Sequence, residues 1–320
     1  MKKLPRVSVI TLSVCLFSAG YVTGAPAPKS ATPKPSQTKP SSPAKSPTPR
    51  PSATPTVSTP PAIQYSRVPF DKSVAKVPAN FKGHDVVALF AALSAKLAGK
   101  GEFETTEAYN SRIAEVLTQP ITGQLTPQSS MALVVDLTPG GEYPDLKYDA
   151  DTQLLQVKEY MGEVPYDLGD YDVRTKQRVI STGRETRKVL DVYEASNGYG
   201  AKADVVKTES QTYDLIMLNP KQFGFKRSET DYLGDRQHIE FDLTMDVPTA
   251  QKVKPNLDLL IIFQIAPPYV GKAKRYFTPK INSPFDTTIH QHYVYVNVSE
   301  IWLYDSKTGE VYQKLTSQEG

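Results

Sequence analysis

LDLLIIFQIA, at residues 257–266, is a run of ten residues that is apolar except for Asp258 and Gln264. A helix that spans a membrane needs about 20 predominantly apolar residues, so this run is too short for one. A short apolar run of this kind is typical of a strand that lies inside a sheet. We therefore expect residues 257–266 to form a central strand.

The segments on either side of this run also predict strands. Residues 239–247 alternate strictly between apolar and polar types, which indicates a sheet with one buried face. Residues 289–305 form one or two further strands, 306–309 a turn, and 310–315 a returning strand. We expect Trp302, Tyr304 and Val311 to pair across this final hairpin and to seal the sheet.

Two helices are predicted before the β region. Residues 84–98 place apolar side chains at helical spacing, with Asp85 near the start and Gly99 after the end. Thr105 is a suitable N-cap for a second helix, which Pro120 ends. Each helix has one apolar stripe, so we expect the two to pack as a pair against the sheet.

The remaining strands complete an α+β prediction. We expect strands at these places: 131–137, 146–148, 154–160, 174–181, 187–193, 201–206 and 213–218. Asp149–Asp151 and Asn197–Gly198 are turns between them, and Pro248 opens a short helix. The predicted fold is an N-terminal helical pair on a largely antiparallel β-sheet, for which a sandwich is one possible arrangement.

Residues 1–24 have the pattern of a secretory signal peptide. Lys2, Lys3 and Arg6 supply the positive charge, residues 7–17 the apolar region, and Val22 with Gly24 the small-residue cleavage site. Two alternatives remain open. Residues 7–25 are retained as a membrane anchor, or Cys15 receives a lipid. In each case the rest of the chain is exported, to the periplasm, the cell envelope or the medium.

Residues 25–62 separate this leader from the rest of the chain. They contain 12 prolines, 13 serines and threonines and five basic residues, with no acidic or aromatic residue. Such a composition cannot bury enough apolar surface to fold. We expect an extended linker that spans up to about 100 Å, at roughly 3.1 Å per residue. Residues 63–320 then form the globular head.

Charge and cysteine content exclude several classes of function. The leader and linker carry eight positive charges and no negative one, which leaves the head with 29 Lys and Arg against 34 Asp and Glu. A nucleic-acid-binding domain is usually basic itself, so no nucleic-acid partner is expected. Cys15 is the only cysteine, so the head has no disulfide and no thiolate metal site. No cofactor is predicted.

His290 and His292 are the best candidates for metal binding. One residue apart on a strand, they point to the same side, as two ligands of one zinc ion require. They share that side with apolar residues at 294, 296 and 298, and a third ligand cannot be placed from the sequence. Structural histidines are therefore the preferred interpretation, and metal binding is the alternative.

Arg174, Lys176 and Arg178 are the candidate binding residues. On a strand they would project from one face as a basic patch for an anionic glycan or a phosphate. An ordinary solvated face of a sheet is the alternative.

Four phrases are found in the head: KGEFETTEAY (100–109), YDADTQLLQV (148–157), SNGYGAKADV (196–205) and WLYDSKTGEVYQK (302–314). In the sequence of these segments and in their order along the chain, the head resembles uncharacterised exported proteins of proteobacteria. The resemblance implies an envelope protein and no known activity.

Two classes of function follow from these observations. The first is a non-catalytic binding or structural module, whose partner is another envelope component (protein, glycan or anionic polymer). Membrane contact is expected only through a leader that is not cleaved. The second is a metal-assisted hydrolase that uses His290 and His292. Since no nucleophile, phosphate-binding loop or complete metal site is found in the sequence, we favour the first and leave enzymatic activity as the alternative.

Overall fold

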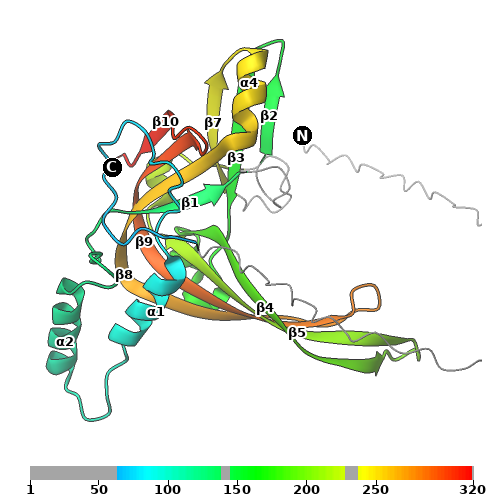
Figure 1. Cartoon of the computed structure of the whole chain (residues 1–320). Coiled ribbons are helices and arrows are strands. Elements are labelled where there is room, and N and C mark those ends of the chain that lie inside the picture. Colours follow the sequence, from blue (N-terminus) through cyan, green and yellow to red (C-terminus); the bar gives the residue numbers. More distant parts are fainter. Residues whose placement is uncertain (1–62, 138–144, 228–236, 319–320) are drawn as a thin grey trace, which may run out of the picture. The chain divides into compact units, whose positions relative to one another are not determined.

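The structure is a computed structural model of the 320-residue chain and describes residues 63–137, 145–227 and 237–318. The predicted leader (1–24) and linker (25–62) lie outside the described residues. Within the described ranges strands predominate, helices are few, and two sheets are formed (Figure 1). None of the helices in these ranges is long and apolar enough to cross a membrane.

The helical elements are short. They are α1 (Val86–Lys96), α2 (Thr106–Thr118), α3 (Tyr171–Arg174) and α4 (Val247–Val253), with 3-10 turns η1 (Tyr166–Leu168), η2 (Pro220–Phe223) and η3 (Lys254–Asn256). The strands are β1 (Met131–Asp136), β2 (Asp145–Asp149), β3 (Leu154–Met161), β4 (Arg178–Ser196), β5 (Lys202–Met217), β6 (Lys226–Arg227), β7 (Gln237–Thr244), β8 (Leu257–Phe277), β9 (Phe285–Asp305) and β10 (Val311–Thr316).

The larger sheet has the strand order β1-β8-β9-β5-β4, and β10 pairs with the second half of β9. All of its pairs are antiparallel except β5 with β9, which is parallel. The predicted central strand is confirmed, because β8 lies between β1 and β9 and its residues 259–263 are fully buried. The strand continues beyond the apolar run for a total of 21 residues.

The smaller sheet has the order β2-β3-β7-β6 and is antiparallel throughout. Its first hairpin turns where predicted, since Asp149 Oδ1 accepts hydrogen bonds from the backbone N–H groups of Asp151 and Thr152. The alternation in β7 is also confirmed, with Ile239, Phe241 and Leu243 buried. It ends earlier than predicted, because Asp246 caps the start of α4.

One hydrophobic core joins the two sheets. It contains Leu155 and Phe241 from the smaller sheet, Ile261 and Leu303 from the larger sheet, and Leu89 from α1. Burial of side chains from both sheets in one cluster is the arrangement of a packed β domain. The fold is thus mainly β with few helices, and its strands are largely antiparallel.

The predicted packing of the two helices is confirmed only for α1. Asp85 is its N-cap, accepting from the N–H groups of Val87 and Ala88, and Leu89 and Leu93 are buried against the sheet. Thr105 caps α2 as expected, but α2 has no buried residue. Its apolar stripe is only half-buried, so the predicted helical pair on the sheet is not confirmed.

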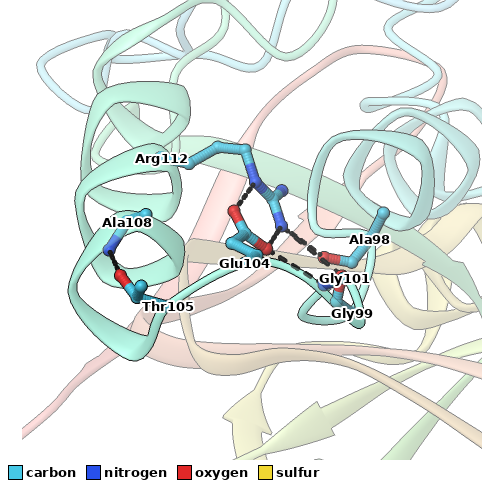
Figure 2. Close-up of polar contacts among 7 residues, drawn as sticks. All are labelled: Ala98, Gly99, Gly101, Glu104, Thr105, Ala108 and Arg112. Atoms are coloured by element: carbon cyan, nitrogen blue, oxygen red, sulfur yellow. Dashed lines mark hydrogen bonds and ion pairs between the residues drawn. The ribbon is translucent and has the colours of Figure 1, made fainter.

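The connection between α1 and α2 is held by one ion pair (Figure 2). Arg112 on α2 donates from Nε and Nη2 to the carboxylate of Glu104, at 2.8 and 3.0 Å. The same Nη2 reaches the carbonyl of Ala98, and Glu104 accepts from the N–H of Gly101. The hydrogen bonds from Arg112 hold the pKa of Glu104 at about 2. These hydrogen bonds connect α2 to the end of α1 and to the loop between them, so α2 is held in place although none of its residues is buried.

The final hairpin forms as predicted. Tyr304 pairs with Val311, and Trp302 is fully buried opposite Lys314. Asp305 Oδ1 accepts from the N–H groups of Lys307 and Thr308 at 2.8 Å each, which closes the turn. Gly309 completes it with φ +74°, a conformation that favours glycine, and a Cβ there would lie 2.1 Å from the carbonyl oxygen of Val77.

Candidate binding groove

Four strands continue past the core as an outer part of the larger sheet, in the order β8-β9-β5-β4 (Figure 1). The strands predicted here are found, but their lengths were wrong. Residues 187–193 are part of the longer strand β4, and the two strands predicted within 201–218 are the single strand β5. The longer strands place side chains of four strands on one surface, and none of the residues lining it is one of the predicted site residues.

A groove of about 560 Å³ lies on one face of this outer sheet. Its lining residues come from all four strands and from the loop that joins β8 to β9: Glu185, Arg187, Ser210, Phe277, Thr278, Lys280, Asn282, Ser283, Phe285, Thr287 and Ile289. Ser210 is only 1% exposed. A volume of this size is in the range of sites for small molecules or for a short segment of a polymer.

Two phenyl rings of the groove each carry a guanidinium group. The Arg187 guanidinium carbon lies 5.6 Å from the ring centre of Phe285, and that of Arg275 lies 4.7 Å from the ring centre of Phe277. In such a contact the guanidinium interacts with the aromatic ring, while its N–H groups can still donate hydrogen bonds to a ligand. Phe277 and Phe285 are 42% and 43% exposed, so both rings also offer apolar surface to a ligand.

The loop between β8 and β9 is fixed by backbone hydrogen bonds. Lys280 and Ser283 exchange two N–H to carbonyl bonds of 3.0 Å each, and Val206 on β5 donates to the carbonyl of Pro284. Below the loop, the hydroxyl groups of Thr208 and Thr287 are 2.8 Å apart. Lys280 is thereby held at the groove on a closed turn.

The predicted basic patch of Arg174, Lys176 and Arg178 does not exist, because these residues do not share a strand. Arg174 ends the helical turn α3, where its guanidinium lies 4.2 Å from the ring centre of Tyr166 and donates to the carbonyl of Gly169. Arg178 is buried and donates to the carbonyls of Thr175 and Gln177. The strand predicted from residue 174 onward begins only at Arg178, because the backbone carbonyl of Asp170 accepts from the N–H groups of Val173 and Arg174 and forms a helical turn.

His290 and His292 do lie on one face of β9, as predicted, and each has a partner. His290 Nε2 is 2.6 Å from Glu209 Oε1, an ion pair when the imidazole is protonated. His292 stacks on Tyr213 with ring centres 4.7 Å apart, and the edge of Phe90 from α1 packs against it. Burial lowers the pKa of His292, so its imidazole is favoured in the neutral form.

Within the described ranges, no three His, Cys, Asp or Glu side chains lie close enough together to hold a metal ion. The pair at 290 and 292 contributes to packing between β5, β9 and α1. Whether the chain binds metal stays a prediction from the sequence.

One carboxyl group near this pair in the sheet is strongly desolvated. Asp214 lies on β5 opposite Tyr293 and accepts from the N–H of Thr182 at 3.0 Å. Burial raises the pKa of Asp214 to about 6, and the hydrogen bonds only partly offset it. Asp214 is not among the residues that line the groove, so we assign its effect to stability.

The groove could not be recognised from the sequence. Arg187 only begins the predicted strand 187–193, and Lys280, Phe277 and Phe285 belong to no motif. Their one signal is that two apolar aromatics occur in a polar stretch, residues 274–288, where a strand would expose them. The parallel pairing of β5 with β9 brings residues about 80 positions apart into register, and no local pattern encodes it.

Comparison with known proteins gives no match, whether against protein-family models, curated proteins or solved structures.

Proposed function

We propose that the chain is an exported envelope protein whose head is a non-catalytic binding module, with the groove on the outer sheet as its binding site. The observation that carries this proposal is the convergence of four strands and a fixed loop on one mixed apolar and cationic surface. Such a surface provides contact area and orientation but contains no paired nucleophile and base.

The proposal includes the origin suggested by the sequence. A signal-like leader and a proline-rich linker suit a head that works at a distance from the N-terminus, and the four phrases resemble exported proteobacterial proteins. The linker sets the reach of the head, and the groove selects what the head holds.

Metal-assisted hydrolysis by His290 and His292 is less well supported. Both imidazoles are already engaged, one by Glu209 and one by stacking on Tyr213. Elemental analysis tests this point, and we expect no stoichiometric zinc. One zinc per chain, lost in the His290→Ala, His292→Ala double variant, would favour the hydrolase.

Sedimentation with a washed, lipid-free wall fraction tests the binding site. The purified full-length chain is compared with a Phe277→Ala, Phe285→Ala variant, which loses the apolar surface of the groove. A matched control, Phe103→Ala with Tyr276→Ala, removes two aromatic side chains that are 95% and 65% exposed and do not line the groove.

Leader and linker are the same in all three proteins, so any difference comes from the head. We expect the groove variant to stay in the supernatant, while the control sediments like the unmodified chain. Equal sedimentation of groove variant and control, with unchanged melting temperatures, would show that the groove is not the binding site.

A further inference from the structure

We infer that the groove binds an acidic glycan, a carbohydrate chain whose sugar rings bear carboxylate groups. This inference rests on the proposed function and specifies the ligand class of the same site.

The charge of the groove favours an anion of low charge density. Arg187 and Lys280 line it with a single carboxylate, that of Glu185, and Arg275 adds a third cation above the Phe277 ring. An arginine positioned over a ring presents a fork of N–H donors that matches a carboxylate in two parallel hydrogen bonds. A densely charged polyphosphate would meet repulsion from Glu185, whereas a sugar with one carboxylate can avoid it.

The other polar groups are suited to ligand hydroxyls. Three exposed lining residues carry a hydroxyl or an amide: Thr278, Asn282 and Ser283. Each of these groups can both donate and accept, as can the hydroxyls of a sugar. Glu185 can accept a hydrogen bond from a sugar hydroxyl as well, whereas a ligand with only anionic groups, such as polyphosphate, has no donor for it.

The aromatic rings are poor platforms for nucleic-acid bases. Base stacking needs a free ring face, but each phenyl ring has a guanidinium over one face. The exposed part of each ring can still contact the apolar C–H surface of a sugar ring. The covered ring faces therefore favour a glycan over a nucleic acid.

A binding experiment with defined probes tests the inference. Fluorescently labelled oligogalacturonate is titrated with the full-length chain at 150 mM salt, in parallel with a neutral galactan oligosaccharide of the same length and with inorganic polyphosphate. The Arg187→Ala, Lys280→Ala variant is compared with Lys188→Ala, Lys274→Ala. This control also removes two positive charges. Lys188 lies on β4, as Arg187 does, Lys274 lies on β8, and neither residue lines the groove.

We expect oligogalacturonate to bind best and the groove variant to bind it at least about 10-fold more weakly, since a hydrogen bond to a charged group contributes on the order of 1.5–3 kcal/mol. The control should change affinity by less than about threefold. Arg187→Lys should be intermediate, because it keeps the charge and loses the two-pronged geometry. Attraction of the probe to the basic linker is common to all variants and cancels in the comparison.

Three results would overturn the inference. Equal affinity for the neutral galactan would remove the role of the carboxylate, and tighter binding of polyphosphate would assign the groove to phosphate polymers. In the third case, neither glycan binds, but the Phe277→Ala, Phe285→Ala variant still fails to sediment with the wall fraction. This would refute an acidic glycan as the ligand and leave the proposed binding function in place.

Discussion

Replacement of Trp302 tests how the final hairpin seals the sheet. The indole is fully buried, its ring packs edge-on against Phe70 with centres 5.7 Å apart, and Lys314 Nζ lies 3.5 Å from the ring centre. Its Nε1–H donates to Glu300 Oε2 at 2.8 Å. Truncation of a buried Trp or Phe to Ala typically costs about 3–5 kcal/mol. Because Trp302 also loses an aromatic pair and a cation–π contact, we expect Trp302→Ala to cost about 4 kcal/mol.

Urea unfolding followed by far-ultraviolet circular dichroism is the suitable assay, since Trp302 is the only tryptophan and its fluorescence disappears in the variant. The midpoint should fall while the slope stays unchanged, which marks a loss of stability in the folded state. Lys314→Ala is the matched control and should cost about 1 kcal/mol or less. A loss below about 1 kcal/mol for Trp302→Ala would show that the hairpin does not close this part of the core.

Other predictions concern the buried carboxyl, a turn, a loop and the linker. Because the pKa of Asp214 in the folded chain is about 6, the stabilising protonated carboxyl is lost as the pH rises through 6. At pH 7.5 we therefore expect Asp214→Asn to have a higher melting temperature and a free energy of unfolding larger by on the order of 2–3 kcal/mol, with no difference at pH 4. Equal melting temperatures at pH 7.5 would contradict this. Gly309→Ala should lower the melting temperature markedly because a Cβ meets the backbone of Val77, whereas Gly198→Ala, with open space around it, should not. Arg112→Ala should speed hydrogen exchange in residues 99–105 without a change in the global melt, since α2 buries no residue, while Glu115→Ala should leave both unchanged. Deletion of residues 25–61 should leave the thermal melt unchanged, and a large drop would mean that this segment packs on the head.

Local patterns were sufficient for most single elements. The helix start near Asp85, the cap at Thr105, the turn at Asp149 and the buried run in β8 all formed as predicted, because each depends on neighbouring residues in the chain. Side-chain caps and strand alternation operate within a few residues, so one sequence contains them in full.

Features that depend on distant residues were not predictable. The sequence indicated two strands within 201–218, but β5 is continuous because β4 and β9 pair with it on both sides along most of its length. Likewise, Arg174 was predicted to lie on a strand, but it ends the helical turn α3, and its guanidinium lies over the ring of Tyr166. The groove combines both problems, since its lining comes from four strands and one loop.

The pairing of β9 has a consequence for the time at which this protein can fold. β9 contacts β8, β5 and β10, and β8 in turn pairs with β1 more than 100 residues earlier in the chain. Contacts of such long sequence separation make folding slow, because a large loop must close before they form. Until residues 285–305 are available, β5 and β8 lack their common neighbour, and the sheet cannot be completed. A chain that still lacks this strand cannot bury β8 between its two neighbours, so the larger sheet is completed only after nearly the whole chain is available.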